Sequence, residues 1–592
     1  MTSGNEVTTA ACAGADANAA ASGADLRTCA EEVLWLLSAH GVRLLFLNPG
    51  TDSAPLQEAA AALAERDVPA PRVVMSTFES VALAAAHGYW QATGDPQAVF
   101  VHVDVGTQNL GAMVHNVLRD RAGAVVLAGR TPYAEDPGSP GARSSPIHWQ
   151  QDVPDQPGII RAYAKWCLEL TRSQDAARVV GRAVQVAGSS IPGLAYLTLS
   201  RDVLMEPAGP ARLRRVTGFA RPLPPAAEPA VLADVARQLA SAQRPVLVTS
   251  RAGRWPGGAE ALGQLAEMAA IPVIGRPEAV NLISSHPLVV RSQAQARTLL
   301  GEADVVLIID CDVPWIPRDA PPPSGALVIQ IDRDPVKADM PLWTFPVDVS
   351  VCAEPVMALR QLAEALGPHR VACAERWETR RAEITGEIAE STRAVHGAAE
   401  GSCPPTNVRA VVRAISHALD PGCLVVEEAV SNLAPVSELL DRIEPQTLYT
   451  PGGPGLGWSP GASVGIKLAR PDRPVVAIVG DGAFLFGVPT AALVMAAEAG
   501  APVTIVVLDN NGYRASRLPV LALFPDGVSA QRGEVIGTRF DHGPDIAALA
   551  RACGAHAVRT DGTDGLPAAL AQALAANQDG TAAVIDVRID QP

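Results

Sequence analysis

The chain has 592 residues, of which 48% are apolar, and its formal net charge at pH 7 is −15. This length predicts several domains with ample cores, and the negative charge argues against nucleic acid or an anionic membrane surface as a partner. The N-terminus lacks the pattern of a secretory signal, and charge, Gly or Pro interrupts every apolar run before about eighteen residues. The 9 cysteines are scattered without metal-binding spacing. We therefore expect a cytoplasmic protein with reduced thiols and no membrane span.

Residues 1–24 are rich in Ala, Gly, Ser and Thr, which predicts a disordered tail. Three blocks of alternating strand and helix signals follow, at residues 25–205, 230–365 and 406–592, and Pro-rich linkers separate them. Regular alternation of this kind predicts an α/β fold with three doubly wound parallel-sheet domains.

The first block contains buried-strand signals at residues 42–47, 73–75 and 98–103. Glu79 follows the second of these strands at the start of a helix of small residues, and it is the only acid between Asp67 and Asp95. Taken alone, Glu79 could simply complement the dipole of its helix.

The third block contains two apolar strands, at residues 475–479 and 503–508, joined by an Ala-rich helix at 489–499. Gly480-Asp481-Gly482 follows the first strand, and Asp509-Asn510-Asn511-Gly512-Tyr513 follows the second. Because parallel strands end at the same edge of a sheet, a carboxylate and an amide oxygen can hold one hard cation there, with backbone N–H groups nearby for a diphosphate. A lone GDG would be an ordinary turn, so the pairing of the two motifs favours a cation–diphosphate site.

This spacing resembles the signature of the thiamine diphosphate (ThDP) enzymes, in which GDG is followed after about 25–30 residues by two asparagines. The resemblance implies Mg²⁺ ligands at Asp481, Asn510 and the carbonyl of Gly512. Asp509 stands where the family usually has its first asparagine, so Asn511 is the alternative ligand if the Asn pair is taken literally.

The resemblance also implies roles for other segments. Glu79 lies in a match to the family pattern E-x-x-A-x-x-x-A-x-G-Y and would contact the aminopyrimidine ring of the cofactor. In the Gly-rich segment 451–458, Leu456 would support the bent cofactor and the carbonyl of Pro454 would accept its amino group. The residues expected to contact the cofactor are Asn48, Pro49, Gly50, Thr51, Ser431, Asn432, Pro454, Leu456, Gly480, Asp481, Gly482, Ala483, Asn510, Gly512 and Tyr513. Because different subunits bind the two ends of the cofactor in this family, we expect a homodimer or homotetramer.

The substrate side resembles benzoylformate decarboxylases and acetolactate synthases. The hydroxyl of Thr51 would meet the substrate carboxylate, and His102 and His286 match two active-site histidines, although a His before Pro in a loop is often structural. Further pocket residues would be Gln108, Trp458, Phe484 and Phe486. The alternative for the three aromatic residues is a place in the core.

The resemblance therefore implies an enzyme that acts on a 2-oxo acid with ThDP and Mg²⁺. It would decarboxylate its substrate and then either release an aldehyde or ligate the acyl unit to an aldehyde or a second keto acid. The middle block shows no glycine fingerprint, so FAD is not expected. The alternatives are a benzoylformate-type decarboxylase without ligation, a non-catalytic ThDP-binding homologue, and a nucleotide-binding α/β protein without thiamine.

Overall fold

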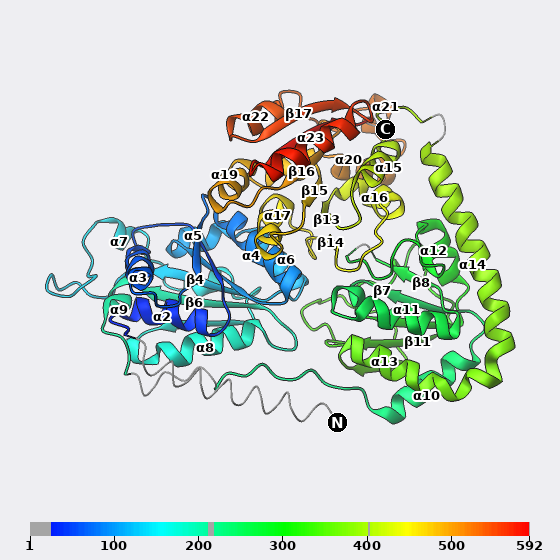
Figure 1. Cartoon of the computed structure of the whole chain (residues 1–592), viewed down its shortest axis with the longest axis horizontal. Helices are drawn as coiled ribbons and strands as arrows, with labels where there is room; N and C mark the ends of the chain where they lie inside the picture. Colours follow the sequence, from blue (N-terminus) through cyan, green and yellow to red (C-terminus); the bar gives the residue numbers. More distant parts are fainter. Residues whose placement is uncertain (1–24, 211–217, 277, 401–402, 591–592) are drawn as a thin grey trace.

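The computed structural model describes residues 25–210, 218–276, 278–400 and 403–590 and has three lobes (Figure 1). Each lobe contains one six-stranded sheet in which neighbouring strands are parallel. This arrangement confirms the predicted three doubly wound domains. The expected disordered tail at residues 1–24 lies outside the described residues.

The first domain has a separate core on each face of its sheet. Leu45 and Leu47 pack with helices on one face, whereas Leu44 and Phe46 pack with helices on the other, because successive strand residues point to opposite faces. The strands in sheet order are β2 (Arg72–Met75), β1 (Leu44–Leu47), β3 (Gln97–Val101), β4 (Ala124–Arg130), β6 (Leu194–Ser200) and β5 (Trp166–Leu170). The main helices are α2 (Cys29–Ala39), α3 (Ala54–Glu65), α4 (Glu79–Thr93), α5 (Val103–Asn109), α6 (Ala112–Arg119) and α8 (Ala176–Ala187).

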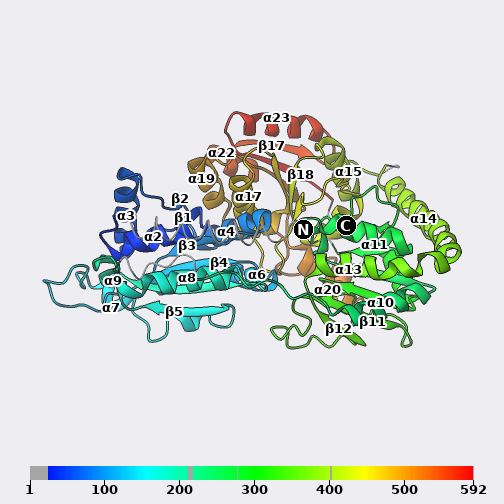
Figure 2. The ribbon, with the colours of Figure 1, turned by 60° about the horizontal axis from the view of Figure 1, so that its bottom comes forward.

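The middle domain has a core of its own. Its strands in sheet order are β12 (Val349–Cys352), β11 (Leu327–Asp332), β10 (Val305–Ile309), β7 (Pro245–Thr249), β8 (Val273–Gly275) and β9 (Val289–Val290). The helices are α10 (Pro229–Ser241), α11 (Gly258–Ala269), α12 (Gln293–Gly301) and α13 (Pro355–Leu366). The long helix α14 (Arg370–Glu400) then runs along the outer edge of the molecule toward the third domain (Figure 1, Figure 2).

The third domain contains the strand–helix–strand unit expected from the sequence, formed by β15 (Val475–Gly480), α19 (Pro489–Ala499) and β16 (Thr504–Asp509). The structure adds a short helix, α18 (Asp481–Phe486), where only a turn was expected. The strands in sheet order are β14 (Leu448–Tyr449), β13 (Leu424–Glu428), β15 (Val475–Gly480), β16 (Thr504–Asp509), β18 (Ala583–Arg588) and β17 (His556–Asp561). The helices are α15 (Val408–Ala418), α16 (Leu433–Leu439), α17 (Trp458–Ala469), α18 (Asp481–Phe486), α19 (Pro489–Ala499), α20 (Arg514–Leu523), α21 (Val528–Arg532), α22 (Ile546–Ala552) and α23 (Leu566–Gln578).

The first and third domains share one continuous core, in which α4 packs against α17. A Cβ atom on Gly88 would lie 2.4 Å from the carbonyl oxygen of Ala462, and one on Gly465 would lie 1.8 Å from that of Ala85. The backbones of the two helices therefore approach more closely than side chains would allow, and small residues on both helices permit this contact.

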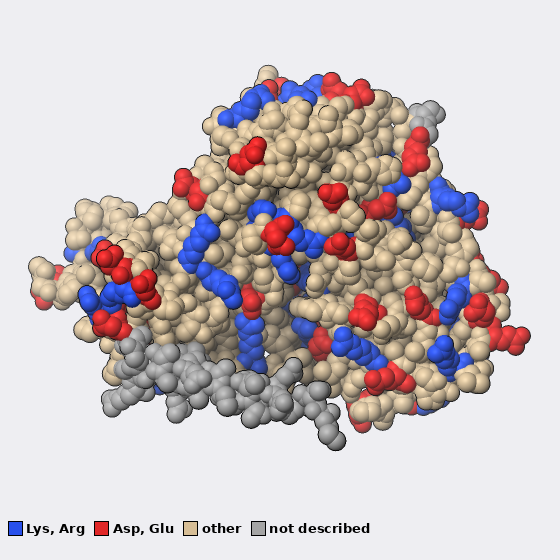
Figure 3. All heavy atoms as spheres, in the orientation of Figure 1, with Lys and Arg blue, Asp and Glu red and all other residues tan. Residues whose placement is uncertain are grey.

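No helix among the described residues is long and apolar enough to cross a membrane. On the face shown in Figure 3, acidic and basic side chains are interspersed over all three lobes.

The α4–α17 contact predicts that Gly465→Ala lowers the apparent unfolding temperature, since overpacking a tight contact costs about 1–3 kcal/mol. The matched control is Gly397→Ala in α14, where an added Cβ would meet nothing within 4 Å. Alanine favours the helix there, so the control protein should unfold at an equal or slightly higher temperature. Thermal unfolding followed by circular dichroism compares the two, and equal midpoints would contradict the prediction.

Candidate active site

Glu79 is the first residue of α4 and is only 6% exposed. Its Oε2 accepts a hydrogen bond of 3.2 Å from Nδ2 of Asn109, at the last turn of α5. A Cβ atom on Gly106 would lie 3.1 Å from Oε1 of Glu79, so the absence of a side chain at Gly106 lets α5 pass closely over the carboxylate. A buried carboxylate is thus held beside a neutral hydrogen-bond donor.

His102 stands at the other end of α5 and pairs with Asp52. Its Nδ1 lies 2.5 Å from Oδ1 of Asp52, and the second carboxylate oxygen accepts the N–H of Val103 at 3.2 Å. The hydrogen bond from the Asp52 carboxylate raises the pKa of His102, so the ring keeps its charge to a higher pH. Asp52 is buried, while 21% of the His102 side chain stays exposed. The imidazole can therefore meet a ligand while its partner holds it in place.

The backbone around this pair is tightly constrained. Val103 has φ of +37°, an uncommon conformation for a β-branched residue, and such strain tends to gather at functional sites. A Cβ atom on Gly50 would lie 2.3 Å from Nδ1 of His102, and one on Gly129 would lie 1.4 Å from Oδ2 of Asp52. These glycines leave the space that the His102–Asp52 pair occupies.

The remaining first-domain candidates lie around this pair. Pro49, Thr51 and Gln108 are exposed. Asn48 is half-buried, and its Nδ2 donates a hydrogen bond of 3.1 Å to the carbonyl of Ser76, which ties the ends of β1 and β2 together. Thr51 is next to Asp52 in the chain and exposed, whereas Gln108 lies near the end of α5 and its Nε2 donates to Oδ2 of Asp104 at 3.2 Å.

The third-domain candidates meet at the ends of β15 and β16, as the sequence predicts. Asp481 is 2% exposed, and its Oδ2 accepts the N–H of Gly512 at 2.8 Å. Burial raises the pKa of Asp481 to about 7, and the nearby Asp509 carboxylate adds to the rise. Asn510 is also buried, at 6% exposure, whereas Asn511 is half-buried and has φ of +59°. These side-chain and backbone oxygens are of the kind that hold a hard divalent cation.

Tyr513 packs over the same turn. A Cβ atom on Gly482 would lie 2.7 Å from the tyrosine ring, and that ring makes an edge contact with Phe540 at a centroid distance of 4.9 Å. Gly480 has open space around the position of a Cβ, and Ala483 is buried. The GDG turn is therefore packed on the Tyr513 side and open at Gly480.

Ser431 and Asn432 lie in the 3-10 turn η6 (Val430–Asn432), which follows β13. Oδ1 of Asn432 accepts a hydrogen bond of 3.2 Å from Nη1 of Arg514, the residue after Tyr513. Sequence reasoning did not select Arg514. Its place directly after the Asn motif was the signal available for finding it.

The Gly-rich segment of the third domain is held by the first domain. Asn116 of α6 donates from Nδ2 to the carbonyl of Gly455 and accepts the N–H of Gly455 at Oδ1, both at 2.8 Å. At the next turn, the buried Glu428 of β13 accepts the N–H groups of Gly457, Trp458 and Ser459. Burial raises the pKa of Glu428 to about 7. Pro454 is exposed and Leu456 is half-buried. The hydrogen bonds therefore fix the segment and leave both residues partly accessible.

Trp458 belongs to a buried polar junction of all three domains. Its Nε1 donates a hydrogen bond of 3.0 Å to Nδ1 of His87, whose Nε2 lies 2.8 Å from Oδ2 of Asp120. Oδ1 of Asp120 pairs with Nη1 of Arg254 from the middle domain at 2.6 Å. Although burial alone would raise the pKa of Asp120, the Arg254 cation and the His87 hydrogen bond hold it below its usual range.

The three aromatic candidates for the substrate pocket differ in their burial. Trp458 and Phe484 are fully buried in the core shared by the first and third domains, so they are core residues and not pocket walls. Phe484 is buried because α18, which the sequence did not reveal, turns it inward. Phe486 is 56% exposed and remains a candidate.

His286 is engaged within the middle domain. Its Nε2 lies 3.2 Å from Oε1 of Glu267 on α11, and its Nδ1 accepts the N–H of Leu288 at 3.2 Å. Nε2 is buried and has no hydrogen-bond partner among the described residues, and a catalytic role for His286 stays a prediction.

Side chains fill the point where a doubly wound sheet usually receives a ligand, at the carboxyl ends of β7 and β10. Nη2 of Arg251 lies 2.9 Å from Oδ2 of Asp312, and Nζ of Lys337 lies 2.8 Å from Oδ1. Nη1 of Arg121, from the first domain, reaches the same Oδ1 at 3.0 Å. The cluster therefore joins the first and middle domains. The expectation that the middle domain takes no FAD stays a prediction.

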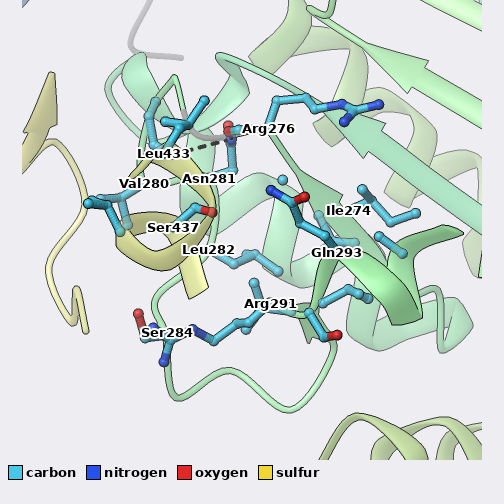
Figure 4. Close-up of a pocket in the computed structure, with 18 of the residues that line it drawn as sticks. Ile274, Arg276, Val280, Asn281, Leu282, Ser284, Arg291, Gln293, Leu433 and Ser437 are labelled. Atoms are coloured by element: carbon cyan, nitrogen blue, oxygen red, sulfur yellow. Dashed lines mark hydrogen bonds between the residues drawn. The ribbon is translucent and has the colours of Figure 1, made fainter. Parts of the chain in front are cut away.

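A cavity of about 290 Å³ lies between the middle and third domains (Figure 4). Its lining includes Ile274, Arg276 and Gln293 from the middle domain and Leu433 and Ser437 from α16. Leu433 directly follows Asn432, so the cavity borders the segment that carries the predicted diphosphate contacts.

Three models of one protein family match the chain. They are described as the N-terminal TPP binding domain, the central domain and the C-terminal TPP binding domain of thiamine pyrophosphate enzymes, and they match residues 27–159, 232–362 and 432–587. Similar proteins include a benzoylformate decarboxylase of Pseudomonas aeruginosa, 27% identical over 567 residues that cover 92% of this chain and 96% of that protein. An acetolactate synthase large subunit, IlvG, of Mycobacterium tuberculosis is 26% identical over 534 residues, which cover 88% of this chain and 89% of that protein.

Solved structures support the same architecture. A thiamine diphosphate-dependent 4-hydroxybenzoylformate decarboxylase of Rhodococcus jostii RHA1 superposes with a TM-score of 0.75 at 22% identity, covering 95% of this chain and 99% of that chain. A putative thiamin diphosphate-dependent enzyme of Mycobacterium smegmatis gives a TM-score of 0.73 at 25% identity, covering 95% of this chain and 100% of that chain.

The His102–Asp52 pair predicts that Asp52→Asn lowers the pKa of His102 toward its ordinary value of 6.5. Because the carboxylate raises this pKa, its removal lets the ring lose its proton at a lower pH. Titration of the 11 histidines by NMR, with His102→Gln used to assign the signal, measures the shift. The control is Asp104→Asn, which removes a more distant charge and should move the signal less. An unchanged His102 titration in Asp52→Asn would contradict the assigned pairing.

Proposed function

The chain belongs to the thiamine pyrophosphate enzymes, and from this premise we propose that it breaks the bond between the carboxyl and carbonyl carbons of a 2-oxo acid, using ThDP and Mg²⁺. Relatives of this chain include 2-oxo acid decarboxylases and acetolactate synthases. The observation that carries the proposal is the buried Glu79 carboxylate, which has Asn109 as its hydrogen-bond partner. A protein that only binds ThDP would not need this acid.

The third domain would hold the metal and the diphosphate. Asp481, Asn510 and the carbonyl of Gly512 supply the oxygen ligands that Mg²⁺ prefers. The burial of Asn510 and the left-handed backbone of Asn511 support Asn510 as the ligand. A divalent cation would also compensate the neighbouring carboxylates of Asp481 and Asp509, which otherwise repel each other.

The first domain would move the protons. Bound ThDP supplies a carbon nucleophile and a sink for the electrons of the broken bond. Glu79 would hold a proton on the aminopyrimidine ring, and His102, whose pKa the Asp52 carboxylate raises, would donate a proton on the substrate side. The exposed Thr51 would meet the substrate carboxylate, and the exposed Gln108 would line the pocket.

The carboxyl group leaves as CO₂, and the acyl unit either takes a proton and leaves as an aldehyde or is joined to a second carbonyl compound. Incubation with ThDP, Mg²⁺ and a panel of 2-oxo acids, with and without aldehydes, tests the proposal through CO₂ release and product mass. Absence of CO₂ release from the whole panel, with ThDP bound, would favour the non-catalytic homologue.

Glu79→Gln should keep ThDP binding and lose about 10²–10⁴-fold in turnover, because the amide cannot hold the transferred proton. Calorimetry measures binding, and hydrogen–deuterium exchange at C2 of the thiazolium measures activation. Glu65→Gln, at the exposed end of α3, is the control and should leave both unchanged. Wild-type exchange in Glu79→Gln would remove the role assigned to this acid.

We also propose that two protomers build each active site, with Glu79 from one and the metal cluster from the other. Large apolar side chains of the segment after the metal cluster are exposed in the single chain, which is unfavourable unless a partner covers them. They are Leu518, Leu523, Phe524 and Val528.

Light scattering of the full chain should therefore give the mass of a dimer or tetramer. Phe524→Glu should shift the protein toward monomers and weaken ThDP binding, since a charge is costly in an apolar interface. The matched control is Leu223→Glu, at a side chain 92% exposed in the linker between the first two domains. A monomeric wild-type protein with full activity would overturn the two-protomer site.

A further inference from the structure

Arg514 carries a positive charge that the described part of the chain does not neutralise. No carboxylate among the described residues forms an ion pair with it, and its Nη1 donates a hydrogen bond to the neutral Oδ1 of Asn432. Its Nε is buried and has no hydrogen-bond partner among the described residues. A buried guanidinium N–H without an acceptor is costly, so this position is suited to receive an anion.

Asn432 presents a second unused donor beside it. The residue is 1% exposed, and its Nδ2 has no hydrogen-bond partner among the described residues. Its Oδ1 is already used by Arg514, so the hydrogen bond between the two residues fixes their relative orientation. Both unpaired groups are donors, so a ligand that pairs with them would supply acceptor oxygens.

The place of the pair indicates which anion it would bind. Arg514 begins α20 two residues after Gly512, whose N–H touches Asp481, and the positive end of a helix adds to the attraction for an anion. Asn432 ends η6, in the segment where sequence analysis placed contacts to the cofactor. A divalent cation at Asp481 would neutralise only part of the charge of a diphosphate, so a second cation nearby would strengthen its binding.

We propose that Arg514 and Asn432 form a second, metal-independent anion clamp for the cofactor diphosphate. This inference rests on the proposed function for the identity of its ligand. The guanidinium and the amide N–H would bind phosphate oxygens directly, while Asp481 would hold the Mg²⁺ ion. The full chain then binds inorganic pyrophosphate weakly even without metal, and part of its affinity for ThDP depends on ionic strength.

Calorimetry on the full-length protein with inorganic pyrophosphate in EDTA tests the clamp. Arg514→Gln should weaken this binding by about tenfold or more, because a charged hydrogen bond is lost. Arg514→Lys should restore part of it, since the charge returns without the guanidinium geometry. The control is Arg178→Gln on α8 of the first domain, an exposed arginine that pairs with Asp175, and this variant should bind as the wild type does. Asn432→Ala removes the second donor and should also weaken binding.

The arms of the experiment separate the possible sources of the anion. Wild-type affinity for pyrophosphate and ThDP in Arg514→Gln, together with unchanged thermal unfolding, would overturn the clamp and leave the proposed function intact. If Arg514→Gln keeps pyrophosphate binding but loses binding of a 2-oxo acid such as pyruvate to the ThDP-loaded protein, the arginine recognises the substrate carboxylate and the clamp is wrong. If the wild type binds neither ThDP with Mg²⁺ nor pyrophosphate, the proposed function fails and the clamp fails with it.

Discussion

The contact between α4 and α17 is the constraint on which the rest of the molecule depends. Glycines on both helices allow their backbones to touch, which makes one core of two domains. Glu79 lies at the beginning of α4, and the Gly-rich segment at 451–457 leads directly into α17. A shift of one helix against the other would therefore move an acid of the first domain and a loop of the third together.

A buried polar junction also fixes the arrangement of the domains, in addition to the close contact of α4 with α17. Trp458, His87, Asp120 and Arg254 form a chain of contacts from the third domain through the first to the middle one. Removing one member of a buried ion pair costs about 3–5 kcal/mol, because its partner is left charged and unpaired. The junction therefore permits few alternative arrangements of the domains, and it fixes the segment that Asn116 and Glu428 also hold.

The His102–Asp52 pair of the first domain and the carboxylate cluster of the third domain, Asp481 and Asp509, have different electrostatics. In the first domain a carboxylate raises the pKa of a histidine, so His102 is suited to proton donation. In the third domain two carboxylates lie close together and burial raises the pKa of Asp481, so that cluster is suited to a cation. Arg514, which forms no ion pair with a carboxylate of the described residues, follows Gly512 by two residues, so a bound anion there would lie near a cation held by the carboxylate cluster.

The sequence by itself determined the three parallel-sheet domains and the strand ends that carry Asp481, Asn510 and Glu79, because strand periodicity and motif spacing are local properties of the chain. Tertiary structure decided the rest. Asp52 and Arg514 acquire their importance from residues about 50 and 82 positions away, a distance that no local pattern reveals. The aromatic residues Trp458 and Phe484 could equally be core or pocket in sequence, and only the packing of α17 and α18 placed them in the core.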